Sequence, residues 1–225
     1  MRTSMQLNAL IRNNMDGLIK GETLSETQIT EMFENILAVE VNDNVMFTFK
    51  KIQEIRENAK YPGYRLSFEA QFDETKQMLK IDVSTGDVIT PKELEYQYKL
   101  MLEDRSINLL VYNVETVLAE KMQSILERGV LNTRAKDFFD VYILTAEETK
   151  TFDDAIFVEA FLNTVKNRET TRILNELDDI INSIESSQAL NTLWERFAKA
   201  NTYAENVSWQ QATAAVKTLM GLIKN

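Results

Sequence analysis

The chain has 225 residues, of which 44% are hydrophobic and 27% are charged, and its formal net charge is −10. This composition is typical of a soluble globular protein with one large or two small domains, and the acidic balance gives no general attraction to nucleic acid. The chain has no cysteine and no histidine, which excludes disulfides, thiolate metal sites and imidazole catalysis. A carboxylate site for a hard cation such as Mg²⁺ is compatible with the composition.

Neither a membrane anchor nor a secretion signal is evident in the sequence. Its apolar runs are too short to span a bilayer, and residues 1–14 lack the apolar centre of a signal peptide. The absence of cysteine also agrees with a reducing compartment. We therefore expect a cytoplasmic protein that does not enter a membrane.

The first half of the chain is predicted to form a helix followed by strands. Residues 23–38 place apolar side chains at helical spacing, and Ser25 with Gln28 three residues later matches a capping box. The next segments alternate apolar and polar residues with the period of a strand. They are residues 44–52, 64–72, 78–83, 96–102 and 107–112.

The second half changes to helical patterns. Residues 114–128 and 134–148 are predicted helices, the first of which ends at Gly129, and several amphipathic segments follow from residue 152. Strands grouped before helices favour an α+β fold. We expect a sheet-containing domain over residues 1–150 and a helical region over residues 151–225.

Asp82 lies on one of the predicted strands. In "MLKIDV" (residues 78–83) the apolar residues share one face, so Lys80 and Asp82 share the other. A half-exposed strand with two polar residues in water explains this pattern without any site. A catalytic or metal-binding carboxylate is the alternative, and the strand alone favours the simpler interpretation.

Lys121 has an unusual position for a lysine. In the predicted helix 114–128 it falls inside the apolar stripe, between the directions of Val114 and Val117. A buried ammonium group is costly unless it is paired. Lys121 therefore either extends to solvent along its aliphatic chain or faces a carboxylate or a phosphate.

Asp137 and Asp140 lie on the most apolar of the predicted helices. Most of the surface of residues 134–144 is apolar, which is typical of a buried helix, yet the two aspartates lie three residues apart on one side. A structural cluster in which they pair with Arg134, Lys136 or Lys121 is one interpretation, and a functional site is the other. Both can hold, because a site needs such supporting contacts.

The order and spacing of these segments resemble the AbiEii/AbiGii family. The similar segments are "LKIDVSTGDVITP" (residues 79–91) and "YKLMLEDRSINLLVYNVETVLAEKMQSILERGVLNTRAKDFFDVYIL" (residues 98–144). Family members are nucleotidyltransferase-like toxins of abortive-infection, type IV toxin–antitoxin systems. The resemblance is close over residues 15–150 and loose over the helical tail. It implies a nucleotidyltransferase-like mixed sheet with helices, followed by a C-terminal helical bundle.

The resemblance also implies roles for individual residues. Asp82 matches a strand aspartate that completes a metal-binding carboxylate set, and Glu120 with Lys121 matches an acid–lysine pair whose lysine lies near the nucleotide phosphates. The implied catalytic residues are Asp82, Lys121 and Asp137. The implied nucleotide-binding residues are Lys80, Glu120, Lys121, Arg134, Lys136 and Asp140.

The family segment R-x-R-D-x-x-D corresponds to residues 134–140, where Lys136 replaces the middle arginine and weakens any bidentate contact there. Family members also have a Gly-containing segment followed by a strand that carries two aspartates, and this chain departs further from that pattern. One alignment places Gln6 and Asn8 at the aspartate positions, and a second, with better spacing, places Asn14 and Asp16 there. An amide does not neutralise Mg²⁺, so the expected metal ligands are Asp82 and Asp16, and we expect the N-terminal catalytic segment to be truncated or degraded.

Two functions follow as expectations. The first is metal-dependent nucleotidyl transfer from an NTP to RNA or another acceptor in abortive-infection defence, with Mg²⁺ as cofactor. The second is a catalytically degraded or truncated family member that acts only as a binding or interaction protein. The expected partners are an NTP, an RNA acceptor and a cognate antitoxin protein.

Overall fold

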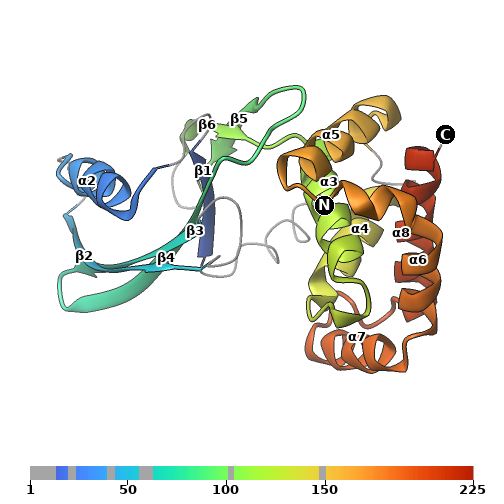
Figure 1. Ribbon diagram of the computed structural model, residues 1–225. Coiled ribbons are helices and arrows are strands. Elements are labelled where there is room, and N and C mark those ends of the chain that lie inside the picture. Colours follow the sequence, from blue (N-terminus) through green and yellow to red (C-terminus); the bar gives the residue numbers. More distant parts are fainter. Residues whose placement is uncertain are drawn as a thin grey trace. The chain divides into compact units, whose positions relative to one another are not determined.

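The computed structural model of the chain describes residues 14–19, 24–39, 44–55, 63–100, 104–146 and 151–224. The chain divides into two compact units, Met1–Asp87 and Val88–Asn225, and each unit is described by itself (Figure 1). The first unit contains a mixed sheet, and the second contains a two-stranded sheet and a group of helices. The predicted α+β class, with a mixed sheet before a helical bundle, is therefore confirmed.

The first unit is built on a four-stranded sheet. Its strands are β1 (Asn14–Ile19), β2 (Val45–Glu54), β3 (Gly63–Phe72) and β4 (Thr75–Thr85), and their order is β1-β4-β3-β2. β1 pairs with β4 in parallel, and the other pairs are antiparallel. Periodicity alone did not predict β1, which carries Asp16, and residues 6 and 8 of the other alignment lie outside the described residues.

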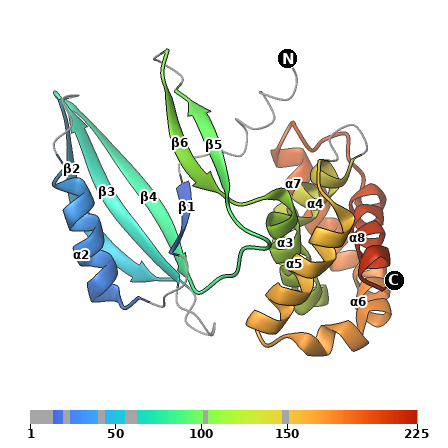
Figure 2. The same ribbon diagram turned by 90° about the horizontal axis from the view of Figure 1, so that it is seen from above.

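Helix α2 (Glu26–Leu37) covers one face of this sheet (Figure 2). The predicted capping box is present, because Ser25 and Gln28 bond reciprocally at the start of the helix. Ile29 is fully buried in a cluster with Leu66 and Phe68 of β3. Since successive strand residues point to opposite faces, Arg65 on β3 and Asp82 on β4 lie on the face away from this cluster.

The second unit begins with the hairpin of β5 (Leu94–Lys99) and β6 (Ser106–Val111). Helices α3 (Val114–Arg128) and α4 (Ala135–Thr145) follow, joined by the short helix η1 (Gly129–Leu131). The remaining elements are α5 (Asp154–Asn167), η2 (Thr171–Asn175), α6 (Leu177–Ser186), α7 (Gln188–Ala200) and α8 (Trp209–Lys224). In Figure 1, α7 runs across one end of α6 and α8.

A single apolar core joins these helices. It includes Leu118 of α3, Phe138 of α4, Phe161 of α5 and Val216 of α8, all of which are buried. The boundary expected near residue 150 therefore falls inside the second unit. The physical reason is that α3 and α4, although they precede residue 150, bury their apolar faces against the later helices.

Candidate functional site

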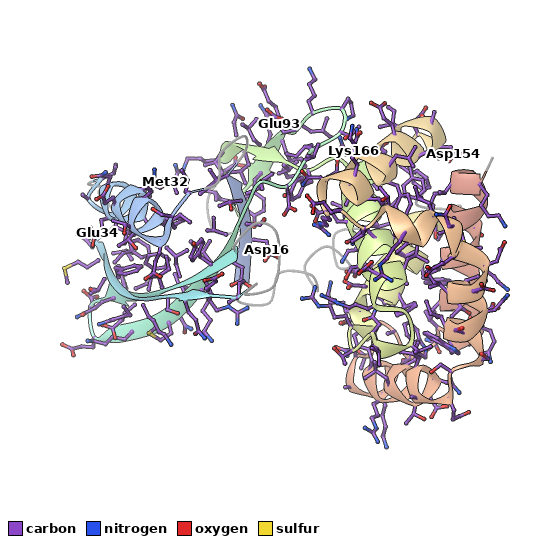
Figure 3. The ribbon with its side chains drawn as sticks, in the orientation of Figure 1. Asp16, Met32, Glu34, Glu93, Asp154 and Lys166 are labelled. Carbon is purple, nitrogen blue, oxygen red and sulfur yellow. The ribbon has the colours of Figure 1, made fainter. Side chains whose placement is uncertain are left out.

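A charged group lies on the open face of the first unit's sheet. Asp16 of β1 and Asp82 of β4 are register partners, and Arg65 of β3 is the register partner of Asp82 on its other side. Register partners point to the same face, so the three side chains lie side by side on adjacent strands. The exposed Asp16 is labelled on β1 in Figure 3. The sheet thus places next to each other the two carboxylates that are expected from the sequence to be metal ligands.

Arg65 binds Asp82 through two hydrogen bonds. Its Nε donates to Oδ1 at 2.7 Å and a terminal nitrogen donates to Oδ2 at 2.6 Å. The hydrogen bonds to Asp82 and the attraction of its charge raise the pKa of Arg65 against the opposing effect of burial, and Asp16 adds a smaller attraction. Asp82 is thus neither the water-exposed residue of the simpler interpretation nor an uncommitted metal ligand, because a cation of the protein already contacts both of its oxygens.

Periodicity did not reveal this pair, although the turn between β3 and β4 could have done so. The hairpin pairs Phe72 with Thr75 across a two-residue loop, and Asp73 in that loop has a φ of 48°. Asp is one of the residues that tolerate this left-handed conformation. Once the loop fixes the register, counting back along both strands places Arg65 opposite Asp82.

The chemistry of the donor set can be tested against Mg²⁺. Carboxylate oxygens suit this hard cation, which in nucleotide sites commonly takes one or two carboxylates, with phosphates and water completing its coordination. Asp16 and Asp82 fit that requirement in type and number, although no group of three or more acidic residues that could hold a metal occurs among the described residues. An incoming Mg²⁺ would compete with Arg65 for the oxygens of Asp82.

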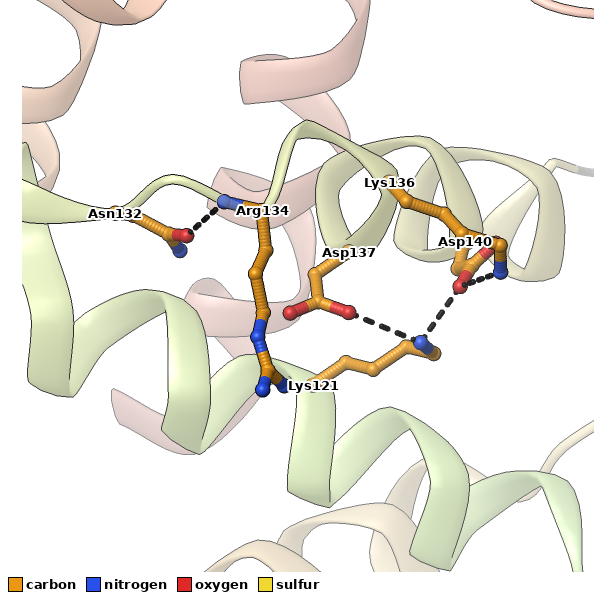
Figure 4. A network of polar contacts seen from close by, with 6 residues as sticks. All are labelled: Lys121, Asn132, Arg134, Lys136, Asp137 and Asp140. Carbon is orange, nitrogen blue, oxygen red and sulfur yellow. Dashed lines mark hydrogen bonds and ion pairs between the residues drawn. The ribbon is translucent and has the colours of Figure 1, made fainter. Parts of the chain in front are cut away.

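A second charged group lies in the helical unit, between α3 and α4 (Figure 4). The Nζ atom of Lys121 lies 3.2 Å from Asp137 Oδ1 and 2.6 Å from Asp140 Oδ2. Lys136 also contacts Asp140, at 3.0 Å and 2.8 Å from its two oxygens. The structural cluster predicted from the sequence is confirmed for Lys121 and Lys136.

Lys121 faces carboxylates instead of extending to solvent. Burial lowers the pKa of its ammonium group, but the attraction of Asp140 and Asp137 and their hydrogen bonds outweigh burial and raise the pKa above the ordinary value of 10.5. The lysine that falls in the apolar stripe therefore stays charged and holds the two aspartates of α4 together.

The remaining predicted nucleotide-binding residues lie in different surroundings. Lys80 is exposed on β4, on the same face as Asp82. Glu120 forms an ion pair with Arg168 at 3.4 Å. The backbone N–H of Arg134 donates to Asn132 Oδ1 at 2.7 Å, which fixes the chain where α4 begins. The roles that the resemblance implies for these residues stay predictions.

An open pocket of about 560 Å³ adjoins the second group. It is lined by the start of α4, including Arg134, Lys136 and Asp137, and by the second half of α7, including Arg196 and Phe197. No pattern in the sequence singles out Arg196, because its position near α4 depends on how the helices pack. Arg196 is an exposed residue of α7, and hydrophobic periodicity does not distinguish it from other exposed charged residues.

The sequence matches the family model described as nucleotidyl transferase AbiEii toxin, type IV toxin–antitoxin system, over residues 16–215. The chain belongs to the AbiEii family. The match begins at Asp16 and ends at residue 215, within α8, so this AbiEii-family protein shares with the family both units and not only the segments around Asp82 and Lys121. The resemblance seen in the sequence is thereby confirmed.

Two solved structures from Helicobacter pylori are also similar. The crystal structure of JHP933 is 10% identical, with a TM-score of 0.43 over 95% of this chain and 76% of that one. A candidate nucleotidyltransferase is 11% identical, with a TM-score of 0.40 over 99% of this chain and 85% of that one. No curated protein matches the sequence. A bilayer-spanning helix is not found among the helices that the structure describes.

Proposed function

We propose that this AbiEii-family protein transfers a nucleotidyl group from an NTP to an acceptor, with RNA as the acceptor class, in abortive-infection defence. The observation that carries the proposal is the register of Asp16 and Asp82, which lie side by side on adjacent strands in a member of a nucleotidyl transferase family. A cognate antitoxin protein is the partner that membership in a type IV toxin–antitoxin family supports, and a cytoplasmic location agrees with this role.

In the first unit, Asp16 and Asp82 would hold Mg²⁺, and Lys80 on the same face is a proposed nucleotide contact. When bound, the metal would neutralise negative charge on the phosphates. Arg65 holds the Asp82 carboxylate in place on the open face of the sheet, because it donates hydrogen bonds to both carboxylate oxygens.

In the second unit, taken by itself, the exposed Arg134 and Lys136 at the start of α4 are proposed phosphate contacts. Lys121 and Asp137 are the proposed catalytic residues of this unit. Lys121 holds Asp137 and Asp140 in place, and it could reach a phosphate by exchanging one of its two carboxylate contacts. Glu120 would support this region through its ion pair with Arg168.

Calorimetric titration of an NTP with and without Mg²⁺ tests the proposal. We expect binding that depends on Mg²⁺ and that weakens at least about tenfold in Asp82→Asn and in the double variant Arg134→Gln/Lys136→Gln, because each removes charge from a proposed contact. Lys217→Gln is a matched control, since Lys217 forms an exposed pair with Glu185 elsewhere in the second unit. Absence of NTP binding by the natural sequence would contradict the proposal.

A second candidate function is supported by the Arg65 contact. Because an internal guanidinium already occupies both oxygens of Asp82, the protein could retain the fold and bind a partner without transferring a nucleotidyl group. This candidate predicts capture of the antitoxin together with NTP binding that is unchanged by Mg²⁺ and by Asp82→Asn.

A further inference from the structure

The open face of the first unit's sheet carries an excess of cations. Register pairing assigns alternate residues of each strand to this face, and Lys50, at a register shift in β2, reaches it by contacting Glu69. The ionisable strand residues described on this face are five cations and three carboxylates: Lys50, Lys51, Arg65, Lys76 and Lys80, and Asp16, Glu69 and Asp82. The face is therefore positive in a chain whose net charge is −10.

The other layer of the same unit has the opposite charge. Helix α2, which covers the other face of the sheet, has three exposed glutamates, Glu26, Glu31 and Glu34, and neither lysine nor arginine. Figure 3 labels Glu34 on this helix and Asp16 on β1. The cations are thus concentrated on one layer of the unit. A negatively charged ligand would be attracted to the open face and repelled by α2.

Three lysines of the open face have no role in the proposed function. Lys50 and Lys76 both contact Oε1 of Glu69, at 3.3 Å each, so two cations share one carboxylate oxygen. Lys51 contacts the neutral side chain of Gln53 at 3.2 Å. All three lysines are exposed. Their charge is only partly compensated by these contacts, so it is available to a ligand.

The lysines extend along the sheet from the carboxylate pair. Lys51 and Lys80 are both register partners of Ser67 on β3, and their row is next to the row of Asp82. Lys76 lies further away on β4, at about 20 Å from Asp82 along the strand. Neighbouring strands are about 4.8 Å apart, and alternate residues of one strand about 6.7 Å. An extended polyanion on this face would therefore meet several cations and end beside the carboxylates.

Two exposed methionines lie among these lysines. Met46 on β2 is 63% exposed and Met78 on β4 is 46% exposed. Met46 is the register partner of Gln71, and Met78 is the register partner of Glu69, so both belong to the open face. Methionine is flexible and apolar, and it is common at binding surfaces that adapt to their ligand. The open face thus offers apolar surface for nucleobases as well as charge for phosphates.

We infer that the open face binds the acceptor RNA as a single strand, with Lys50, Lys51 and Lys76 contacting phosphates and the two methionines packing against bases. The inference rests on the proposed function, in which RNA is the acceptor class, and adds the surface that holds this RNA. The net charge gives the chain no general attraction to nucleic acid, so an RNA acceptor requires a local cationic surface. A single strand is favoured because its unpaired bases are accessible to side chains.

Binding of a fluorescein-labelled single-stranded RNA of about 12 nucleotides is measured by fluorescence anisotropy from about 50 to about 200 mM salt. We expect the triple variant Lys50→Gln/Lys51→Gln/Lys76→Gln to weaken binding at least about tenfold at the lowest salt. The slope of log K against log salt should become shallower by about 2, because each lost phosphate contact accounts for about 0.7. Circular dichroism checks that each variant folds.

The matched control is Lys199→Gln/Lys217→Gln/Lys224→Gln. It removes the same charge from exposed lysines of α7 and α8. As on the sheet, two of the three lysines are in ion pairs, since Lys217 contacts Glu185 and Lys224 contacts Asp178. The control should leave the salt slope unchanged, because its lysines lie outside the open face.

Met46→Gln/Met78→Gln tests the base contacts, because it keeps the length of both side chains and removes apolar surface. We expect RNA binding to weaken about threefold with an unchanged salt slope, since no phosphate contact is lost. Poly-glutamate is the second probe, because it carries negative charge without bases. It should compete with the labelled RNA only weakly, and the methionine variant should not alter that competition.

These measurements separate the inference from the proposed function. A loss of RNA binding in the lysine variant that the control does not share supports the inference. Equal RNA binding by the lysine variant and its control overturns it. Equal binding of RNA and poly-glutamate by the natural sequence also overturns it, because the face would then attract any polyanion, such as an acidic protein. The proposed function stands in both cases if NTP binding still depends on Mg²⁺, and absence of NTP binding contradicts the proposed function alone.

Discussion

The two units of this protein hold carboxylates next to cations in contrasting surroundings. On the open face of the first unit's sheet, Asp82 and Arg65 have 18% and 37% of their side chains exposed. Between α3 and α4 of the second unit, the corresponding values are 5% for Asp140 and 22% for Lys121. The same type of ion pair is therefore accessible to solvent and to ligands in one unit and mostly enclosed in the other.

This difference affects what each pair can do. A buried pair is difficult to break, because removal of one partner leaves an uncompensated charge in an apolar environment. A pair on an open sheet face exchanges its partner at lower cost, since water and ions can replace the lost contact. We therefore expect exchange of a Lys121 contact to cost more free energy than exchange of the Arg65 contact.

Lys121→Met should produce the largest effect on stability. The substitution keeps the length of the side chain and leaves Asp137 without its cation, so we expect the free energy of unfolding to fall by about 3 kcal/mol, near the lower end for a buried pair because Lys136 still contacts Asp140. Urea unfolding followed by tryptophan fluorescence measures this, because Trp194 and Trp209 both lie in the core of the second unit.

Lys217→Met is the control for this substitution. Lys217 and Glu185 form an exposed pair, with 44% and 33% of their side chains exposed, so its loss should cost less than about 1 kcal/mol. If both variants lost the same free energy of unfolding, the Lys121 contacts would be worth no more than an exposed ion pair, and the contrast between the two units would not hold.

Alkaline pH should weaken the second unit through Lys121. Because the pKa of Lys121 is raised in the folded protein, its pairing stabilises the fold fully below the ordinary value of 10.5 and is lost as the pH rises through the folded value. The difference in unfolding free energy between the natural sequence and Lys121→Met should be constant from about pH 8 to about pH 10 and shrink above that range. A difference that grows with pH would contradict the assignment.

Arg65→Gln should strengthen metal binding, by a smaller free energy than the loss of stability expected for Lys121→Met. Removal of the competing guanidinium should tighten Mg²⁺ binding by about three- to tenfold, because a partly exposed charged contact is worth about 1 kcal/mol. Lys76→Gln is the matched control, since Lys76 on the adjacent strand β4 forms an exposed pair with Glu69 of β3. Titration calorimetry with Mg²⁺ should show no comparable change in the control, and equal changes would indicate only a general charge effect.

The sequence predicted the helical contacts better than the sheet contacts. Lys121, Asp137 and Asp140 could be anticipated because each is a charged residue on a helix face that is otherwise apolar. A charge in such surroundings is costly unless it is paired, and the structure confirms that these residues pair with one another. The predicted pairing of Arg134 with Asp137 is not observed, and α4 begins just after Arg134, which leaves its side chain at the edge of the pocket.

The contacts of Asp82 could not be read from periodicity, because a period of two assigns a residue to a face and not to a neighbour. The register with Arg65 depends on the two-residue loop between β3 and β4, and the register with Asp16 depends on a parallel pairing between segments far apart in the chain. Likewise, Arg196 and the start of α4 line the same pocket because of how the helices pack, which no local sequence pattern encodes.

Transfer of label from an α-³²P-labelled NTP to RNA tests the central claim most directly. The proposed function predicts labelled RNA when Mg²⁺ is present, a loss of label when the metal is chelated, and at least about a hundredfold less label with Asp82→Asn, because that variant removes one of two proposed metal ligands. RNA that stays unlabelled by the natural sequence with every NTP, or labelling that is unchanged in Asp82→Asn, would contradict the assignment of the Asp16 and Asp82 pair as the catalytic carboxylates.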